Sequence, residues 1–289
     1  MIFRTTHSTT YMYSEPVSIC HTEVHLEPRK HWRQTLLEHD LKVQPEPDFH
    51  VSRRDYFGNE VVFFTIHQPH TTLTITSVSL VNVPSTELPH PALTPPWEHV
   101  VELMKENDDG ASFEANQYPF ESPQVKCAPE FAAYAAISFP AGRPALEGAI
   151  DLQRRIFKEF KYDQRATTVT TPVEEVLRDK QGVCQDFAHL MIACLRSLGL
   201  PARYISGYLK SGKDSIGAEA SHAWVSMFTP GFGWLDFDPT NNVMPNDGHV
   251  TVAWGRDYSD VTPVKGVALG GGDQFINVSV EVVPVDVVG

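Results

Sequence analysis

The chain has 289 residues, 42% of them hydrophobic, which is enough for one large domain or for two ordinary domains with cores of their own. It carries 36 acidic against 23 basic residues and a formal net charge of −13, which argues against nucleic acid or an anionic membrane surface as a partner. Its first residues lack the basic and apolar regions of a signal peptide, and no apolar run reaches the length of a membrane span. We therefore expect a cytoplasmic protein with no nucleic-acid or membrane partner.

Four cysteines are widely spaced in the chain: Cys20, Cys127, Cys184 and Cys194. This spacing contains no C-x-x-C pair, so it indicates reduced thiols rather than a disulfide framework, and it offers no zinc site. Cys20 also begins a CH-x-x-x-H run with His21 and His25, but the alternation of a strand places the cysteine and the histidines on opposite faces. We expect no metal and no cofactor.

Short alternating runs from residue 9 to about residue 83 predict an antiparallel β domain, which we bound at residues 1–84. In TTLTITSVSLVNV, apolar residues recur two apart among Thr, Ser and Asn, as in a half-buried strand. The segment PSTELPHPALTPPW then carries five prolines, which cannot propagate a helix or a sheet. We expect a stiff linker over 85–97 and a second domain over 98–289.

The second domain is predicted to be helical first and to form strands afterwards. Apolar residues of ALEGAIDLQRRIFKEF approximate one helical face, and CQDFAHLMIACLRSLGLP repeats this spacing before a Gly and a Pro end the helix. Strand-like runs follow at 203–209, 221–228, 233–240 and 249–254. This order predicts an α+β fold in which a helix packs on an antiparallel sheet.

Cys184 opens the second of these helices. A helix N-terminus favours the thiolate, which is the nucleophilic form of cysteine, and the Cys184 amide could donate to a developing oxyanion. Gly182 permits a close approach of the backbone to a substrate, and we expect it in the substrate site. By position alone, a buried structural cysteine is an equally good interpretation.

A nucleophilic cysteine needs a base, and the base needs an orienting group. His222 lies in SHAWVSMF, and the turn PGFG after this run predicts a hairpin that brings the acids of GWLDFDPT back beside it. Asp238 is the expected orienting acid and Asp236 is the alternate. His189 is a rival base, because it lies on the same predicted helix as Cys184.

Aromatic residues near these motifs are expected to line the cleft. Tyr208 and Trp224 are predicted substrate-binding residues, whereas core packing is the favoured role of Trp234. The polar run 256–258 is either a salt-bridged loop or part of the substrate pocket, and we favour the loop.

Together, GVCQDFAHL, SHAWVSMF and GWLDFDPTNN resemble the core of the transglutaminase-like superfamily, with Cys, His and Asp in the same chain order. The N-terminal runs YMYSEPV and RDYFGNEVV, and the tail WGRDYSDVTPVKGV, resemble a bacterial branch that carries a β domain before this core. The resemblance implies a papain-like fold with Cys184 as nucleophile, His222 as base and Asp238 as orienting acid. It does not supply the second oxyanion donor.

The resemblance favours a cysteine-dependent amide or peptide hydrolase that acts through a thioester acyl-enzyme on a peptide, a protein or a small amide. The alternative is a protein-glutamine gamma-glutamyltransferase, in which an amine resolves the same thioester into an isopeptide bond. A third interpretation is a non-catalytic binding module on the same fold, and the complete set of Cys184, His222 and Asp238 speaks against it. The oligomeric state stays open.

Overall fold

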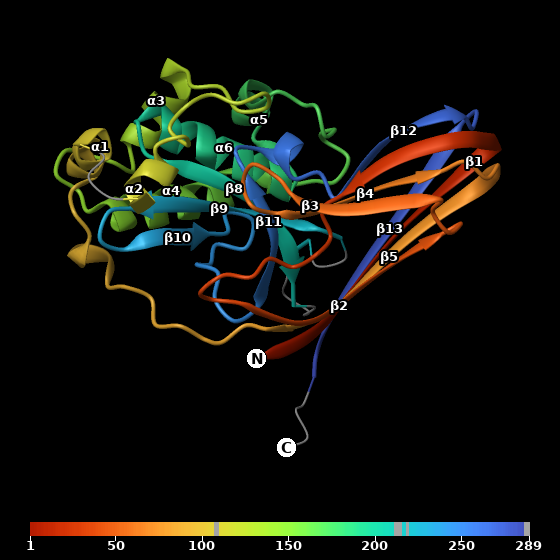
Figure 1. Ribbon diagram of the computed structural model, residues 1–289. Coiled ribbons are helices and arrows are strands. Elements are labelled where there is room, and N and C mark those ends of the chain that lie inside the picture. Colours follow the sequence, from red (N-terminus) through yellow and green to blue (C-terminus); the bar gives the residue numbers. More distant parts are fainter. Residues whose placement is uncertain (107–109, 211–215, 218–219, 286–289) are drawn as a thin grey trace.

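The computed structural model describes residues 1–106, 110–210, 216–217 and 220–285. Figure 1 shows a fan of long strands beside a compact unit in which helices cover a smaller sheet. No helix in these described ranges is both long enough and apolar enough to cross a membrane. The mixed α+β fold with an N-terminal antiparallel sheet confirms the prediction.

The N-terminal sheet is built around β1 and runs in the order β2-β5-β1-β4-β3, with every pair antiparallel. Buried and half-buried positions alternate from Leu73 to the end of β5, but the buried set includes Ser77 and Ser79, whereas the apolar Val78 and Leu80 lie on the other face. The first five strands are β1 (Ile2–Val24), β2 (Thr35–Gln44), β3 (Phe49–Arg54), β4 (Glu60–Ile66) and β5 (His70–Asn82).

The last two strands, β12 (Val264–Gly270) and β13 (Gln274–Pro284), pair with β1 and not with the second sheet. Figure 1 shows these blue strands beside the red β1. We had placed them in the second domain, 98–289, but the 23-residue β1 offers two long edges, and local alternation does not reveal which edge a distant strand joins. The boundary at 85–97 stays a prediction.

The second sheet has four antiparallel strands in the order β10-β9-β8-β11. Helix α6 is buried along most of its length and packs against β8, β9 and α3. The strands are β8 (Ala202–Leu209), β9 (His222–Thr229), β10 (Gly233–Phe237) and β11 (His249–Gly255), with a short pair β6 (Lys161–Tyr162) and β7 (Gln181–Gly182). The helices are α1 (Trp97–Glu106), α2 (Gly110–Ala115), α3 (Pro129–Ala136), α4 (Ala145–Glu159), α5 (Val173–Asp179) and α6 (Cys184–Ser197), with 3-10 turns η1 (Pro91–Leu93) and η2 (Tyr258–Asp260).

Gly207 is where this sheet tolerates no side chain. It pairs with both neighbouring strands, and a Cβ there would lie 2.2 Å from the Val250 carbonyl oxygen and 2.5 Å from the Trp224 ring. The Val250 carbonyl cannot move aside without disturbing the pairing of β8 with β11. We therefore expect Gly207→Ala to lower the free energy of unfolding by about 3 kcal/mol in urea denaturation. Gly248→Ala is the control, since its Cβ would meet nothing nearer than 4.0 Å. Equal midpoints for the two variants would contradict this account.

Candidate active site

Cys184 is the first residue of α6, as predicted, and follows an extended Val183. The Asp186 carboxylate closes this turn, accepting from the Val183 amide at 2.8 Å and from the Thr167 hydroxyl at 2.6 Å. A Cβ on Gly182 would lie 2.7 Å from Oδ2 of Asp186. Gly182 therefore makes room for the carboxylate that fixes the helix start. It is not among the residues that line the cavity at Cys184, which corrects our expectation of a substrate contact.

His222 begins β9 and meets Asp238, which directly follows β10 in the predicted hairpin. Nε2 of His222 lies 2.8 Å from Oδ2 of Asp238, and both side chains are fully buried. The other ring nitrogen, Nδ1, is buried and has no hydrogen-bond partner at ordinary distance in the described part of the chain. Cys184 lines the same cavity as His222 and favours the charged form of its ring.

The Asp238 carboxylate is held by five donors. Oδ1 accepts from the amides of Thr240 at 2.9 Å and Asn241 at 3.1 Å. Oδ2 contacts Nε2 of His222 and Nε2 of His249, the latter at 3.2 Å, and accepts from the Asn241 side chain at 2.9 Å. This network leaves the carboxylate one orientation and thereby fixes the ring of His222.

Electrostatics favour a charged pair here. Burial by itself raises the pKa of Asp238 and lowers the pKa of His222, because a buried site disfavours charge. Their mutual attraction and hydrogen bond outweigh this effect, so the pKa of Asp238 lies well below its ordinary range and the pKa of His222 lies above it. At neutral pH, the pair is a carboxylate and an imidazolium.

Gly217 lies over the other side of the His222 ring. A Cβ on Gly217 would be 2.9 Å from Nδ1, and its φ of 86° is one that other residues rarely adopt. The neighbouring Ile216 exchanges hydrogen bonds with the Asn241 side chain, whose amide also holds Asp238. Asn241 therefore links the segment 216–217, which contacts His222, to Asp238.

Cys184 and His222 open into a cavity of about 580 Å³. Phenols and amides supply much of its polar wall, and the polar members beside the reactive pair are Tyr162, Gln164, Gln185, Tyr204, Ser206, Ser221 and Tyr258. Burial raises the pKa of Tyr162 and of Tyr204, with the Cys184 sulfur adding to the effect, so both phenols stay protonated donors at neutral pH. The sequence does not single out Tyr162, Gln164 or Tyr204, because no motif or spacing links them to Cys184.

The two aromatic residues that we had expected in the cleft lie elsewhere. The Tyr208 hydroxyl contacts Nδ1 of His7 on β1 at 3.0 Å, and Tyr208 is 2% exposed. Trp224 is fully buried and meets the His249 ring edge-on at 5.2 Å between centroids. The substrate-binding prediction for both residues needs correction. Strand β8 faces the cavity with Tyr204 and Ser206, whereas its Tyr208 end packs against the N-terminal sheet.

The rival base and the alternate acid are engaged elsewhere. Nε2 of His189 accepts from the Tyr258 amide at 3.2 Å, and burial lowers the pKa of His189 to about 4. Asp236 forms an ion pair with Arg33 at 3.5 Å. Of the two acids, Asp238 is the one that contacts His222.

The run 256–258 combines both of its expected roles. Arg256 pairs with Asp260 through two 2.9 Å contacts, which makes the predicted salt-bridged loop. Tyr258, two residues further on, lines the cavity at Cys184.

One group of described residues has the composition of a metal site: His222, Asp238 and His249, whose ligand atoms lie within 4.8 Å of one another. Two of these contacts are already hydrogen bonds, at 2.8 and 3.2 Å, and the Asn241 amide fills a further position. An ion would have to separate the partners and displace that amide. The arrangement fits a hydrogen-bonded network better than a metal centre.

The order of these residues on a helix and an antiparallel sheet defines a papain-like α+β protein. The chain belongs to the transglutaminase-like superfamily: residues 135–239 match the transglutaminase-like superfamily core, and residues 3–82 match the bacterial transglutaminase-like N-terminal region. An uncharacterized Mycobacterium tuberculosis protein is 41% identical over 98% of this chain and 92% of its own. A Mycobacterium leprae relative, also uncharacterized, is 31% identical over 96% and 97%.

Two further comparisons carry descriptions of activity. A Pseudomonas aeruginosa protein-glutamine gamma-glutamyltransferase is 32% identical over 103 residues, which are 31% of this chain and 15% of that protein. A Cytophaga hutchinsonii crystal structure, described as a candidate cysteine protease, superposes with a TM-score of 0.78 over 99% of this chain and 91% of its own. Its identity of 22% supports the fold alone.

Proposed function

We propose that the protein is a cysteine-dependent amide or peptide hydrolase, with Cys184 as nucleophile, His222 as base and acid, and Asp238 as the orienting carboxylate. The observation that carries the proposal is the arrangement of these three side chains around one cavity. A helix-start thiol and a buried histidine share one cavity, and a five-donor carboxylate fixes the histidine. This is the geometry that nucleophilic catalysis by cysteine requires.

In the resting site His222 already holds the proton as an imidazolium, so Cys184 acts as the thiolate partner of this ring and attacks the substrate carbonyl to give a tetrahedral oxyanion. The Cys184 amide at the helix start can donate to that oxygen, and the Gln164 side chain, which lines the same cavity, is a further candidate donor. The imidazolium then protonates the departing amine as the C–N bond breaks, leaving a thioester. Neutral His222 next removes a proton from water, whose oxygen attacks the thioester and releases the acid and the thiolate.

Hydrolysis is preferred over amine transfer because of the cavity wall. An amine acceptor such as a lysine side chain arrives as a cation, and a carboxylate is the group that would hold it. None of the described residues that line the cavity is acidic. Phenol, amide and hydroxyl groups in a space of about 580 Å³ are suited to ordered water beside an acyl group. Amine transfer, the activity named for the P. aeruginosa relative, is the second candidate.

The test is a competition between water and an amine. A library of glutamine-containing peptides is incubated with the protein in the presence and absence of a tagged primary amine, and products are read by mass spectrometry. We expect hydrolysis products, either deamidated or cleaved peptides, whose formation requires Cys184. The amount of these products should change little when the amine is added. Tag incorporation that outpaces hydrolysis would assign the protein to the transferases. Catalysis by the Cys184→Ala variant equal to that of the wild type would reject both.

Substrate and setting complete the proposal. A peptide, a protein or a small amide fits the chemistry, because each presents the amide bond that a thiolate attacks. All four cysteines are free, which supports a reducing, cytoplasmic setting.

A further inference from the structure

A second cavity of about 170 Å³ lies on the opposite face of the catalytic sheet. Tyr204 and Ser206 of β8 line the Cys184 cavity, whereas the alternate residues Arg203 and Ile205 line the second one. Because successive side chains of a strand point to opposite faces, the sheet separates the two spaces. The second cavity is closed in part by the N-terminal segment that carries His31.

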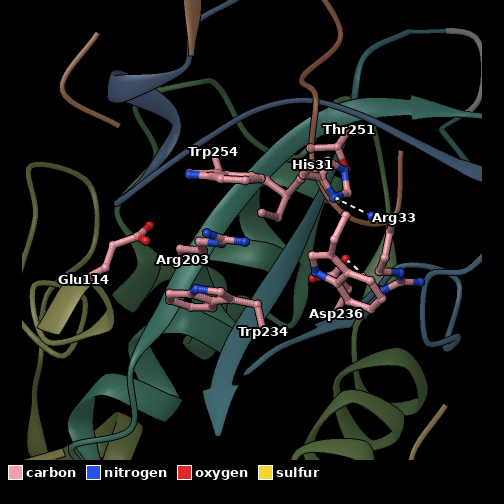
Figure 2. A pocket seen from close by; sticks show the side chains of 10 residues that line it. His31, Arg33, Glu114, Arg203, Trp234, Asp236, Thr251 and Trp254 are labelled. Atoms are coloured by element: carbon pink, nitrogen blue, oxygen red, sulfur yellow. Dashed lines mark hydrogen bonds and ion pairs between the residues drawn. The ribbon is translucent and has the colours of Figure 1, made fainter. Parts of the chain in front are cut away.

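Arg203 is the central group of this cavity. Its guanidinium lies between two indole rings, 3.8 Å from the centroid of Trp254 and 4.0 Å from that of Trp234. Figure 2 shows Trp254 on one side of the guanidinium and Trp234 on the other. Both faces of the planar group are therefore covered, and only its edges remain open to a partner.

The charge of Arg203 has no counter-ion at contact distance. Arg203 is 6% exposed, its Nε has no hydrogen-bond partner, and no carboxylate in the described ranges lies within ion-pair distance of it. Tyr118 offers a hydrogen bond, but burial raises the pKa of this phenol to about 12, so it brings no negative charge. Asp236 and Glu114 favour this charge only from a distance, so a contacting anion would further offset the cost of burying it.

Further positive charge surrounds the same space. Arg29 lies on the Trp254 ring at 3.5 Å, and its Nε also lacks a partner. Burial, with Arg203, Arg33 and Arg29 in turn, lowers the pKa of His31 to about 3, so this ring lines the cavity as a neutral group. The guanidinium groups of Arg29, Arg33 and Arg203 thus all contribute positive charge near His31 and the cavity that it lines.

Two carboxylates limit the charge that a ligand can carry. Asp236 lines the cavity and already pairs with Arg33 at 3.5 Å, and the exposed Glu114 lies at its rim, as Figure 2 shows. Both carboxylates repel an anionic ligand, and they repel a dianion twice as strongly as a monoanion, which already supplies the single charge that Arg203 needs. A planar carboxylate matches the slot between the indoles, whereas the oxygens of a tetrahedral group project out of the guanidinium plane toward the two rings.

We propose that this cavity is a binding site for a planar monoanion, a carboxylate, held edge to edge by Arg203 between Trp234 and Trp254. A carboxylate lies in the plane of a guanidinium and accepts from its Nε edge and a neighbouring Nη, the bidentate geometry that this pair favours. The site lies across the sheet from the thiol, and its volume of about 170 Å³ suits a small carboxylate-bearing molecule and not the amide that is cleaved.

Acetate is the probe, because it carries the carboxylate and little else. The intrinsic tryptophan fluorescence of the full-length protein is titrated with sodium acetate, with sodium chloride and sodium phosphate at equal ionic strength as references. Trp234 and Trp254 form the slot, so we expect a saturable change with acetate alone. Arg203→Met keeps a long apolar side chain but removes the guanidinium group. It should weaken acetate binding by about tenfold or more. Arg154→Met, which removes an exposed arginine of α4, is the matched control and should bind as the wild type does.

Three outcomes would overturn the proposal: equal acetate binding by the Arg203→Met variant and the wild type, identical responses to acetate and chloride, or tighter binding of phosphate than of acetate. Should Arg203→Met fail to fold, Asp236→Asn supplies the decision. Removing this carboxylate lowers repulsion and should tighten acetate binding, and a weaker or unchanged response would count against the site. Alkylation of Cys184 with iodoacetamide should leave acetate binding unchanged, and its loss on alkylation would place the carboxylate in the catalytic cavity instead.

Discussion

Replacing Cys184 with alanine is expected to lower kcat/KM for amide cleavage by about 10⁴-fold or more, because no other group of the site can form the thioester. The substitution removes one sulfur from a half-buried position at the helix start and leaves the hydrogen bonds of Asp186 intact. Folding should therefore be retained. Steady-state kinetics on a peptide substrate found with the amine-competition library, together with circular dichroism, measures both effects.

Iodoacetamide labelling at neutral pH provides the control for this variant. Burial raises the pKa of the Cys194 and Cys127 thiols, which makes both poor nucleophiles. Cys184 should be the labelled residue in the wild type, and Cys127→Ala should be labelled like the wild type. Equal labelling of the wild type and Cys184→Ala would remove Cys184 from the role of nucleophile.

Asp238→Asn is expected to lower kcat by about 10³-fold or more, since the amide presents a hydrogen-bond donor where the His222 ring needs an acceptor. The carboxylate charge that favours the imidazolium is lost at the same time. The matched variant is Asp236→Asn, two residues earlier on the hairpin, where the carboxylate pairs with Arg33 and not with His222. It should keep most of the activity.

The same pair of variants separates orientation from folding. Asp238 is fully buried and accepts from five donors, so Asp238→Asn should also lower the midpoint of urea unfolding, and activity is compared under conditions where both variants are folded. A larger activity loss in Asp236→Asn than in Asp238→Asn would transfer the orienting role to Asp236.

Contact of Asp238 with a second imidazole, His249, is a feature of the site that the catalytic motifs do not include. His249 comes from β11, at the opposite edge of the sheet order from the strand that precedes Asp238. Because this carboxylate accepts from several parts of the fold, its position depends on the whole sheet and not on the hairpin alone. A local error in the sheet, as expected for Gly207→Ala, would therefore disturb the site as well as stability.

The sequence alone determined the features that depend on local chain geometry. A 3-4 apolar repeat that begins just after Cys184 and ends before Gly199 predicts a helix whose first turn contains the cysteine. The PGFG turn between two strand patterns likewise brings His222 and the acids after it into one hairpin. The superfamily, the α+β class and the contact between His222 and Asp238 agree with this local information.

The residues that line the cavity at Cys184 and the strands that complete the N-terminal sheet depend on contacts between segments that are far apart in the chain. Tyr204 and Tyr208 share the same alternation along β8, and a neighbour that is remote in sequence, His7, decides which of them reaches the cavity. The pairing of β12 and β13 with β1 and the enclosure of Arg203 between Trp234 and Trp254 also join segments that are far apart. Periodicity fixes which face a side chain takes, but the packing of distant elements fixes what that face meets.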